Sequence, residues 1–305
     1  MNINSIIAIT DFSVAGNAAL DRAAQLAAVH RTTLKLMSLP DPSDQSRSSA
    51  AVCLAHSARQ LAQRHELSAR PVTQVAKSVT HLAEEAASTD LLVLAHERAF
   101  SISSMFLGRL PERLLRLCRC PVLVIKNVPR EPYSRILVAV DFTPESRTLA
   151  RLASGIDAAA DVALFHAQDT QIEARLRSAN VSPEIIERYR DRCIREARAD
   201  MIQFIDSFEA GSHRVLHAIG RGDPGRQTAV QQLHDGADLV VVGKRRRSAL
   251  SDLMLGSIAA EALRAAASDV LVVPHDFLSA GRVALHRGAA AARDVALLPA
   301  RGSAS

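Results

Sequence analysis

Three residues in the second half of the chain have types and positions that suit a phosphate-bearing ligand. Gly243 ends an apolar run, and the pair Gly256-Ser257 opens a later helical pattern. A glycine at a strand end lets the backbone approach a ligand closely. A Gly-Ser pair at a helix start offers unpaired N–H groups, a hydroxyl and the positive end of the helix dipole. These residues therefore predict a phosphate site.

Two further residues follow apolar runs in the same half of the chain. Asp141 could hold a ribose hydroxyl, and Ala167 lies just after an expected strand. In open α/β sheets, ligands bind beyond the carboxyl ends of the strands, so residues in these places share one edge. A structural interpretation stays open for these residues, because Asp141 could cap a turn, Gly243 could simply terminate its strand and Ser257 could be an ordinary N-cap.

The elements that would position these residues form an internal repeat. Residues 6–13 and 136–143 are both short apolar runs that end in Asp-Phe-Ser/Thr, 130 residues apart. The runs 90–95 and 238–243 also match, as do the closing runs 121–125 and 269–273, and for these the offset has grown to 148. The repeat predicts two copies of one fold.

Filling the gaps gives the order β-α-β-α-β-α-β-α-β in each copy. Second strands are expected at 34–37 and 162–166, third strands near 72–75 and 214–217, and one long amphipathic helix over 173–206. Ser13 and Thr143 are the expected helix N-caps, with Pro144 at the first helical position. Alternating strands and helices predict an α/β fold of two tandem doubly wound domains, each a five-stranded parallel sheet with helices on both faces.

The domains are expected at 1–127 and 134–275, joined by a linker with two prolines and followed by a flexible tail, 276–305. The 305 residues contain no apolar run long enough to span a bilayer, and the N-terminus lacks the basic region of a secretory signal. Four scattered cysteines do not suit a disulfide framework. These features predict a cytoplasmic protein with no membrane partner.

Several chemistries find no support in the sequence. It contains no Walker A motif. The run Gly220-Arg221-Gly222-Asp223-Pro224-Gly225 has GxGxxG spacing, but it contains a proline and indicates an ordinary strand-to-helix turn. The eleven histidines form no cluster, and the i, i+4 pair His213 and His217 is expected beside or in a strand, which does not suit a metal pair. Cys118 and Cys120 form a CxC pair without a second pair, which favours a structural role at a helix end. The net charge is +5, Trp is absent and aromatics are 3%, so nucleic acid is not the expected partner. We predict no catalytic residue and no metal site.

The pattern Asp-Leu-Val-Val-Val-Gly at 238–243, then Leu-Gly-Ser-Ile-Ala at 255–259 and Asp-Val-Leu-Val-Val-Pro at 269–274, resembles the universal stress protein family. The resemblance covers about 3–127 and 134–275 and is more specific in the second half. It implies a five-stranded parallel sheet with helices on both faces and pairing of copies through their last strands. It therefore implies that the two domains form an intramolecular pseudo-dimer, and the family's usual dimers make a homodimer a further expectation.

Members of this family that bind ATP carry the motif G-x2-G-x9-G-[S/T]. By the resemblance, Gly243 matches its first glycine, and Gly256 and Ser257 match its final pair. Asp141 matches the aspartate on the adenosine side, and Ala167 matches a position whose backbone meets adenine. Cofactor binding is thus expected at Asp141, Ala167, Gly243, Gly256 and Ser257, with ATP as the cofactor in the C-terminal domain only.

Arg246 departs from this motif, since it stands where the second glycine belongs. Its side chain could obstruct the phosphate channel, or the basic run 244–247 could supply cations to phosphate oxygens. In the first copy Ala95, Arg98 and Arg109 replace three motif residues and only Gly108 remains. The N-terminal domain is therefore expected to be a structural partner without a nucleotide.

The resulting functional prediction is a non-enzymatic cytoplasmic stress-response protein with an adenine-nucleotide site in its C-terminal domain. One alternative is a weak ATPase or nucleotide-transferring enzyme, for which Asp252 is the only nearby carboxylate that could assist. The other alternative is an interaction scaffold that binds no ligand.

Overall fold

The computed structural model describes residues 3–38, 44–72, 78–96, 110–207, 215–244 and 256–277. Within these ranges, no helix has the length and apolar character that crossing a membrane requires. The strands are β1 (Ser5–Thr10), β2 (Thr33–Ser38), β3 (Ala69–Pro71), β4 (Leu91–Ala95), β5 (Val122–Ile125), β6 (Arg135–Ala139), β7 (Asp161–Gln168), β8 (Leu216–Arg221), β9 (Leu239–Lys244) and β10 (Asp269–Pro274).

The helices alternate with these strands in both halves. They are α1 (Val14–Val29), α2 (Asp44–His65), α3 (Val79–Ala86), α5 (Leu110–Leu117), α6 (Pro144–Ser154), α7 (Gln171–Ser178), α8 (Pro183–Ser207), α9 (Pro224–Asp235) and α10 (Ser257–Ala265). The chain is therefore an α/β protein with two doubly wound halves, as the repeat predicted.

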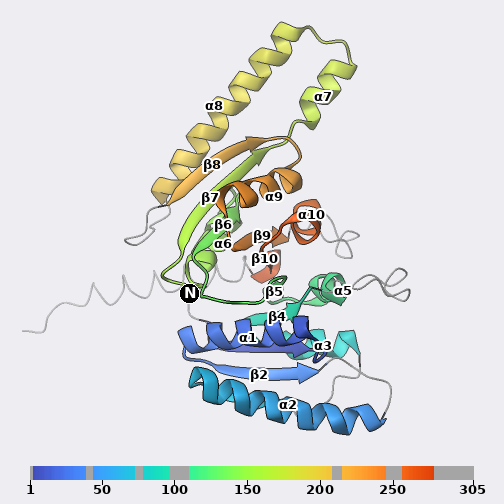
Figure 1. The fold of residues 1–305 in the computed structure, drawn as a ribbon. Coiled ribbons are helices and arrows are strands. Elements are labelled where there is room, and N and C mark those ends of the chain that lie inside the picture. Colours follow the sequence, from blue (N-terminus) through green and yellow to red (C-terminus); the bar gives the residue numbers. More distant parts are fainter. Residues whose placement is uncertain are drawn as a thin grey trace, which may run out of the picture.

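The ten strands of the described residues join into one sheet, in the order β3-β2-β1-β4-β5-β10-β9-β6-β7-β8. Each half is parallel, and the halves meet where β5 pairs antiparallel with β10 through Val122–Val124 and Val270–Val272 (Figure 1). This is the pairing of last strands that the resemblance implied. Strand order reverses between β1 and β4 and between β6 and β9, and such switch points are where ligands bind in open α/β sheets.

Each face of the sheet has one hydrophobic core that runs through both halves. One core packs α1, α2, α6 and α8 on the sheet, and the other packs α3, α5 and α10 on the opposite face. Buried side chains alternate between the faces along each strand, as Ile6 and Ala8 lie in the first core and Ile7 and Ile9 in the second. The shared cores make the two halves one structural unit.

Local sequence sets the helix ends. The Ser13 and Thr143 side chains accept hydrogen bonds from the backbone N–H groups of Gly16 and Ser146, which confirms both predicted N-caps. Asp223 caps α9 in the same way. That helix ends at Gly236, whose φ of 63° lies in the left-handed region that glycine adopts without a steric penalty.

Three predicted elements differ from the structure. The third strand of the first copy is β3, three residues before the expected position, and residues 73–75 lie outside the described residues. The third strand of the second copy, β8, begins at Leu216 and ends at Arg221. The prediction of one helix over 173–206 was wrong, because the chain turns between α7 and α8.

This turn has two local causes. Asn180 adopts φ 54°, which is outside the helical region, and Pro183 cannot continue a preceding helix but is well suited to begin one. The two helices form a hairpin that extends beyond the sheet at the end of the C-terminal half (Figure 1). The expected tail, 276–305, lies outside the described residues from 278 onward.

Candidate functional site

The candidate site begins with the turn that follows β6. The Asp141 Oδ1 atom accepts hydrogen bonds from the Thr143 hydroxyl at 2.5 Å, the Thr143 N–H at 3.2 Å and the Ser146 hydroxyl at 2.5 Å. The Asp141 N–H in turn donates to the Ser146 hydroxyl oxygen at 3.1 Å. Asp141 therefore caps its own turn, and this network holds its carboxylate at the carboxyl end of the strand.

The residue after Asp141 has an uncommon backbone conformation. Phe142 has φ 61°, a value that is costly for a residue with a large side chain, and Phe12 at the matching place in the first copy has the same φ. The Phe142 ring lies 4.3 Å from the His166 ring, between centroids, and 6.1 Å from the Phe204 ring. Aromatic packing thus fixes the Asp-Phe-Thr turn against β7 and α8.

His166 links this turn to the next strand end. Its Nδ1 atom lies 2.9 Å from the Val140 carbonyl oxygen, which can only accept, so Nδ1–H is the donor. Ala167 is the next residue of β7 and pairs with Gly220 of β8. A Cβ on Gly220 would lie 2.6 Å from the Phe165 ring, so any larger residue here would require the ring to shift.

The phosphate side of the candidate site is built by β9 and α10. Gly243 lies in β9 opposite Val273 of β10, with one more strand residue after it. Gly256 is the N-cap residue of α10 and Ser257 is its first helical residue, so Gly256, not Ser257, takes the N-cap position. Within the described residues no side chain caps this helix start, whereas α6 and α9 are capped by Thr143 and Asp223. First-turn N–H groups without a side-chain cap suit an anion.

The loop between these two elements lies outside the described residues. It includes Arg246 and Asp252, and in the first copy Arg98, Gly108 and Arg109 lie outside as well. The structure brings Asp141 and Gly243 to the carboxyl ends of the paired strands β6 and β9, and Ala167 to the neighbouring strand β7. The five predicted residues thus belong to one edge of the sheet, where their ligand role stays a prediction.

Lys244 does not fit the expectation that the basic run faces phosphate. Its Nζ atom donates to the Leu115 carbonyl at 2.8 Å and to the Arg116 carbonyl at 3.2 Å, at the C-terminus of α5 in the other half. A cation at a helix C-terminus neutralises the negative end of the dipole and pairs its last carbonyls. Lys244 is therefore a contact between the halves.

The first copy repeats the turn with one informative difference. The Asp11 Oδ1 atom accepts from the Ser13 N–H at 3.0 Å and from the Ser13 hydroxyl at 2.6 Å. Gly16 stands where the second copy has Ser146, and a Cβ there would lie 2.3 Å from Asp11 Oδ1. The turn geometry is thus shared by both halves, so it does not by itself distinguish a binding half from a structural half.

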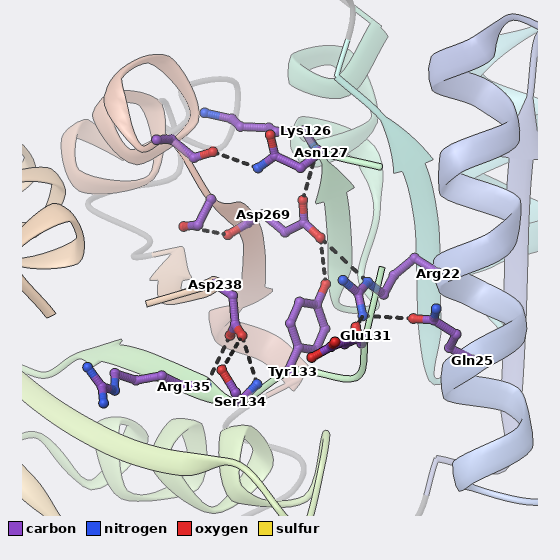
Figure 2. Close-up of polar contacts among 12 residues, drawn as sticks. Arg22, Gln25, Lys126, Asn127, Glu131, Tyr133, Ser134, Arg135, Asp238 and Asp269 are labelled. Atoms are coloured by element: carbon purple, nitrogen blue, oxygen red, sulfur yellow. Dashed lines mark hydrogen bonds and ion pairs between the residues drawn. The ribbon is translucent and has the colours of Figure 1, made fainter. Parts of the chain in front are cut away.

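Sequence reasoning missed a buried polar cluster between the halves (Figure 2). The Asp269 carboxylate accepts from the Lys126 N–H at 2.8 Å and from the Tyr133 hydroxyl at 2.8 Å, and the Arg22 Nε atom lies 3.7 Å from Asp269 Oδ2. The Arg22 guanidinium also lies over the Tyr133 ring, 4.0 Å from its centroid. These groups come from α1, the end of β5, the linker and the start of β10.

Burial dominates the electrostatics of this cluster. It raises the pKa of Asp269 above its usual value, although the Lys126 N–H, the Tyr133 hydroxyl and the Arg22 charge act in the opposite direction. Burial and the nearby Asp269 charge raise the pKa of Tyr133 well above its usual value, so the phenol stays protonated and can donate. The only sequence signal was that Asp269 stands where the first copy has Pro121.

Sequence reasoning also missed the role of Asp90 and Asp238, which occupy equivalent positions in the two copies of the repeat. Asp238 accepts from the Ser134 N–H at 2.7 Å and the Arg135 N–H at 3.1 Å at the start of β6. Asp90 accepts from the Asn4 N–H at 2.8 Å just before β1. Each aspartate thus joins the start of its half's first strand to the start of the strand beside it.

Metal-ligand groups and cysteines are further features of the described residues to consider. No group of three or more His, Cys, Asp or Glu side chains there could hold a metal ion. Cys118 and Cys120 are free and buried, and a hydrogen bond with Cys118 together with burial raises the pKa of the Cys120 thiol. A thiol that stays protonated is a poor nucleophile, in agreement with the structural role predicted for the pair.

Glu173 of α7 anchors the α7–α8 hairpin. Its buried carboxylate contacts three guanidinium groups: Arg190 Nε of α8 at 3.3 Å, Arg177 Nη2 at 3.8 Å, and Arg221 Nη2 at the end of β8. Burial acts to raise the pKa of Glu173, but the hydrogen bonds and charges of Arg221 and Arg190 outweigh it and lower the pKa below its usual value. The hairpin is thus tied ionically to the carboxyl edge of the sheet.

Comparison with known protein families shows that both copies of the repeat match the same family. The profile of the universal stress protein family matches residues 2–126 and, separately, residues 132–274. A search of curated protein sequences gave no match. The expected boundaries at 127, 134 and 275 stay a prediction.

Solved structures resemble the chain, two of those described here along most of its length. A universal stress protein from Archaeoglobus fulgidus DSM 4304 is 16% identical over 90% of this chain and 97% of its own, with a TM-score of 0.66. A protein of unknown function from Pseudomonas aeruginosa PAO1 is 24% identical over 92% of this chain and 95% of its own, with a TM-score of 0.64. A universal stress protein solved in complex with cAMP is 22% identical over 48% of this chain and 99% of its own, with a TM-score of 0.35.

Proposed function

Because the chain belongs to the universal stress protein family, as a member with two tandem domains, we propose that it is a non-enzymatic stress-response protein of the cytoplasm. Its C-terminal domain binds an adenine nucleotide, and ATP is the nucleotide we expect. The N-terminal domain is its structural partner.

The observation that supports the nucleotide site most is the start of α10. This helix begins at Gly256, where the described residues provide no side-chain cap, and it follows β9, which is one of the two strands at the switch point. Its first-turn N–H groups suit phosphate oxygens, and the glycine leaves room for close approach. In this arrangement Gly243 and Ser257 lie on the phosphate side, while Asp141 and Ala167 lie on the nucleoside side.

The absence of a catalytic role rests on the side chains available at this edge. Phosphoryl transfer needs a positioned base or water and a metal held by carboxylates or hydroxyls. Asp141 is the carboxylate that we place in the site, and its Oδ1 atom is engaged by the Thr143 and Ser146 hydroxyls. These contacts favour a sensor over an ATPase or a nucleotide-transferring enzyme.

The test is release and titration of nucleotide with the full-length protein. Heat-denatured purified protein is analysed by chromatography: intact ATP supports the sensor, ADP supports an enzyme, and no nucleotide supports a scaffold. Nucleotide-free protein is then titrated with ATP. Gly256→Ala should weaken binding about tenfold, because the added methyl group crowds the phosphate side. Gly256 has φ −55° and ψ 150°, which alanine adopts readily, so the variant should fold.

The matched control is Gly108→Ala, which makes the same change at the residue of the first copy that matches Gly256 in the repeat. It should leave ATP affinity within about twofold if only the C-terminal domain binds. Equal affinity of the wild type and Gly256→Ala would contradict the proposed phosphate site.

A further inference from the structure

The two halves border an open cleft at the edge of the sheet opposite to the candidate nucleotide edge of the C-terminal half. Since β5 and β10 are antiparallel, the carboxyl edge of the N-terminal half and the amino edge of the C-terminal half lie on the same side. The cleft has a volume of about 910 Å³ and is lined by the start of α1, the linker 126–134, the end of α9 and residues 267–269. We call it the interdomain cleft.

The polar groups at the base of this cleft are bound to one another (Figure 2). Asp269 accepts from Lys126 and Tyr133, and Asp238 accepts from Ser134. The Lys126 Nζ atom donates to the Ala266 carbonyl at 2.6 Å. The charged side chains that line the cleft are three of each sign, namely Arg22, Lys126, Arg130, Glu131, Asp238 and Asp269. The cleft therefore offers little to a ligand with a strong net charge.

The rim of the cleft carries three exposed apolar side chains among the exposed polar residues Asn127, Arg130, Glu131 and Ser134. Val14 of α1, Val128 of the linker and Leu233 of α9 are 80%, 62% and 63% exposed, and all three line the cleft. Single exposed apolar residues are ordinary on a protein surface. These three come from separate elements and surround one hollow, which is the arrangement expected of a binding site.

We propose that the interdomain cleft is a binding site for an uncharged, largely apolar small molecule, separate from the proposed nucleotide site. Its volume lies within the roughly 300–1,000 Å³ that small-molecule sites occupy, and such sites favour domain interfaces. The ligand's apolar body contacts Val14, Val128 and Leu233. The bonded polar base gives the cleft a fixed shape, which lowers the entropic cost of binding.

The experiment titrates full-length protein with Nile red, an uncharged apolar dye that fluoresces when it leaves water. Two matched pairs of variants compare exposed residues of one helix. Leu233→Glu changes the rim, whereas Val230→Glu changes a 58% exposed residue of α9 that does not line the cleft. Val14→Glu changes the rim, whereas Val29→Glu changes a 50% exposed residue of α1 outside it.

The wild type should bind the dye saturably, with one site per chain. Leu233→Glu and Val14→Glu should each weaken binding about tenfold or more, because a buried carboxylate replaces apolar contact. Val230→Glu and Val29→Glu should stay within about twofold of the wild type. The proposal is overturned if the wild type shows no saturable binding or if each control weakens binding as much as its rim variant.

Two further outcomes would also overturn it. Displacement of the dye by ATP would place the dye in the nucleotide site. Sedimentation velocity that shows a dimer of the wild type and Val230→Glu but a monomer of Leu233→Glu would mean that a second copy of the chain covers the cleft. Dye binding that is insensitive to ATP, by a protein whose association state is the same in all variants, supports the small-molecule site whatever the nucleotide assay gives.

Discussion

The hydroxyl of Tyr133 provides a direct measure of how strongly the buried cluster joins the two halves. Tyr133→Phe removes one atom and one hydrogen bond, the 2.8 Å bond to Asp269 Oδ2, between residues that are each 2% exposed. The ring, and with it the contact with the Arg22 guanidinium, remains. The change therefore isolates the hydrogen bond from the packing.

The expected magnitude follows from the partners that remain. A hydrogen bond to a charged group contributes about 1.5–3 kcal/mol, and a buried acceptor that loses a donor cannot be compensated by water. Asp269 keeps the Lys126 N–H, and Arg22 stays 3.7 Å away. We therefore expect a loss of about 2 kcal/mol in the free energy of unfolding, or about thirtyfold in the unfolding equilibrium.

Urea unfolding followed by circular dichroism measures this loss. Tyr189→Phe is the matched control, because Tyr189 is the other tyrosine of the chain and lies half-buried on α8. The control should change the free energy of unfolding by less than about 0.5 kcal/mol. If Tyr133→Phe has no larger effect than Tyr189→Phe, the cluster does not stabilise the contact between the halves and the reasoning is refuted.

Two further predictions concern Glu173 and Gly220. Because Arg221 and Arg190 hold the folded-state pKa of Glu173 below its usual 4.5, its contribution to stability is present above pH 4.5 and is lost as pH falls through the folded-state value. Glu173→Gln should therefore be less stable than the wild type at pH 7 in urea unfolding, and the difference should shrink toward pH 3; a difference that grows in acid would contradict this. Gly220→Ala places a Cβ 2.6 Å from the Phe165 ring and should destabilise the protein by about 1–3 kcal/mol in thermal unfolding. Phe165→Leu in the same chain should recover part of the loss, and additive losses would exclude the clash as the cause.

Short sequence patterns were sufficient to predict turns and helix N-caps, because these depend on interactions between residues close together in the sequence. The Asp-Phe-Ser/Thr turns and the N-caps Ser13 and Thr143 could be predicted because their hydrogen bonds span only a few residues. The α/β class followed from the alternation of apolar runs. The break between α7 and α8 carried a signal in Asn180 and Pro183, but the amphipathic period continued past it and concealed it.

The interactions between the halves could not be predicted from such patterns. Arg22, Tyr133 and Asp269 are far apart in the sequence, and only the antiparallel pairing of β5 with β10 brings them together. The same holds for Lys244, which follows a motif glycine yet contacts α5 of the other half. A basic residue near a motif does not reveal which surface its side chain meets until the topology is known.

The pairing of β5 with β10 also makes assembly independent of protein concentration. In a dimer of single-domain chains the same contact would form by collision, and dilution would separate the partners. Here the linker keeps the two halves at a high effective concentration, so the contact between β5 and β10 forms within one molecule. Each half can then differ from the other, since a substitution in one copy is not repeated in its partner. Pro121 in the first copy matches Asp269 in the second, and Gly16 matches Ser146; an association of identical chains could not contain such differences.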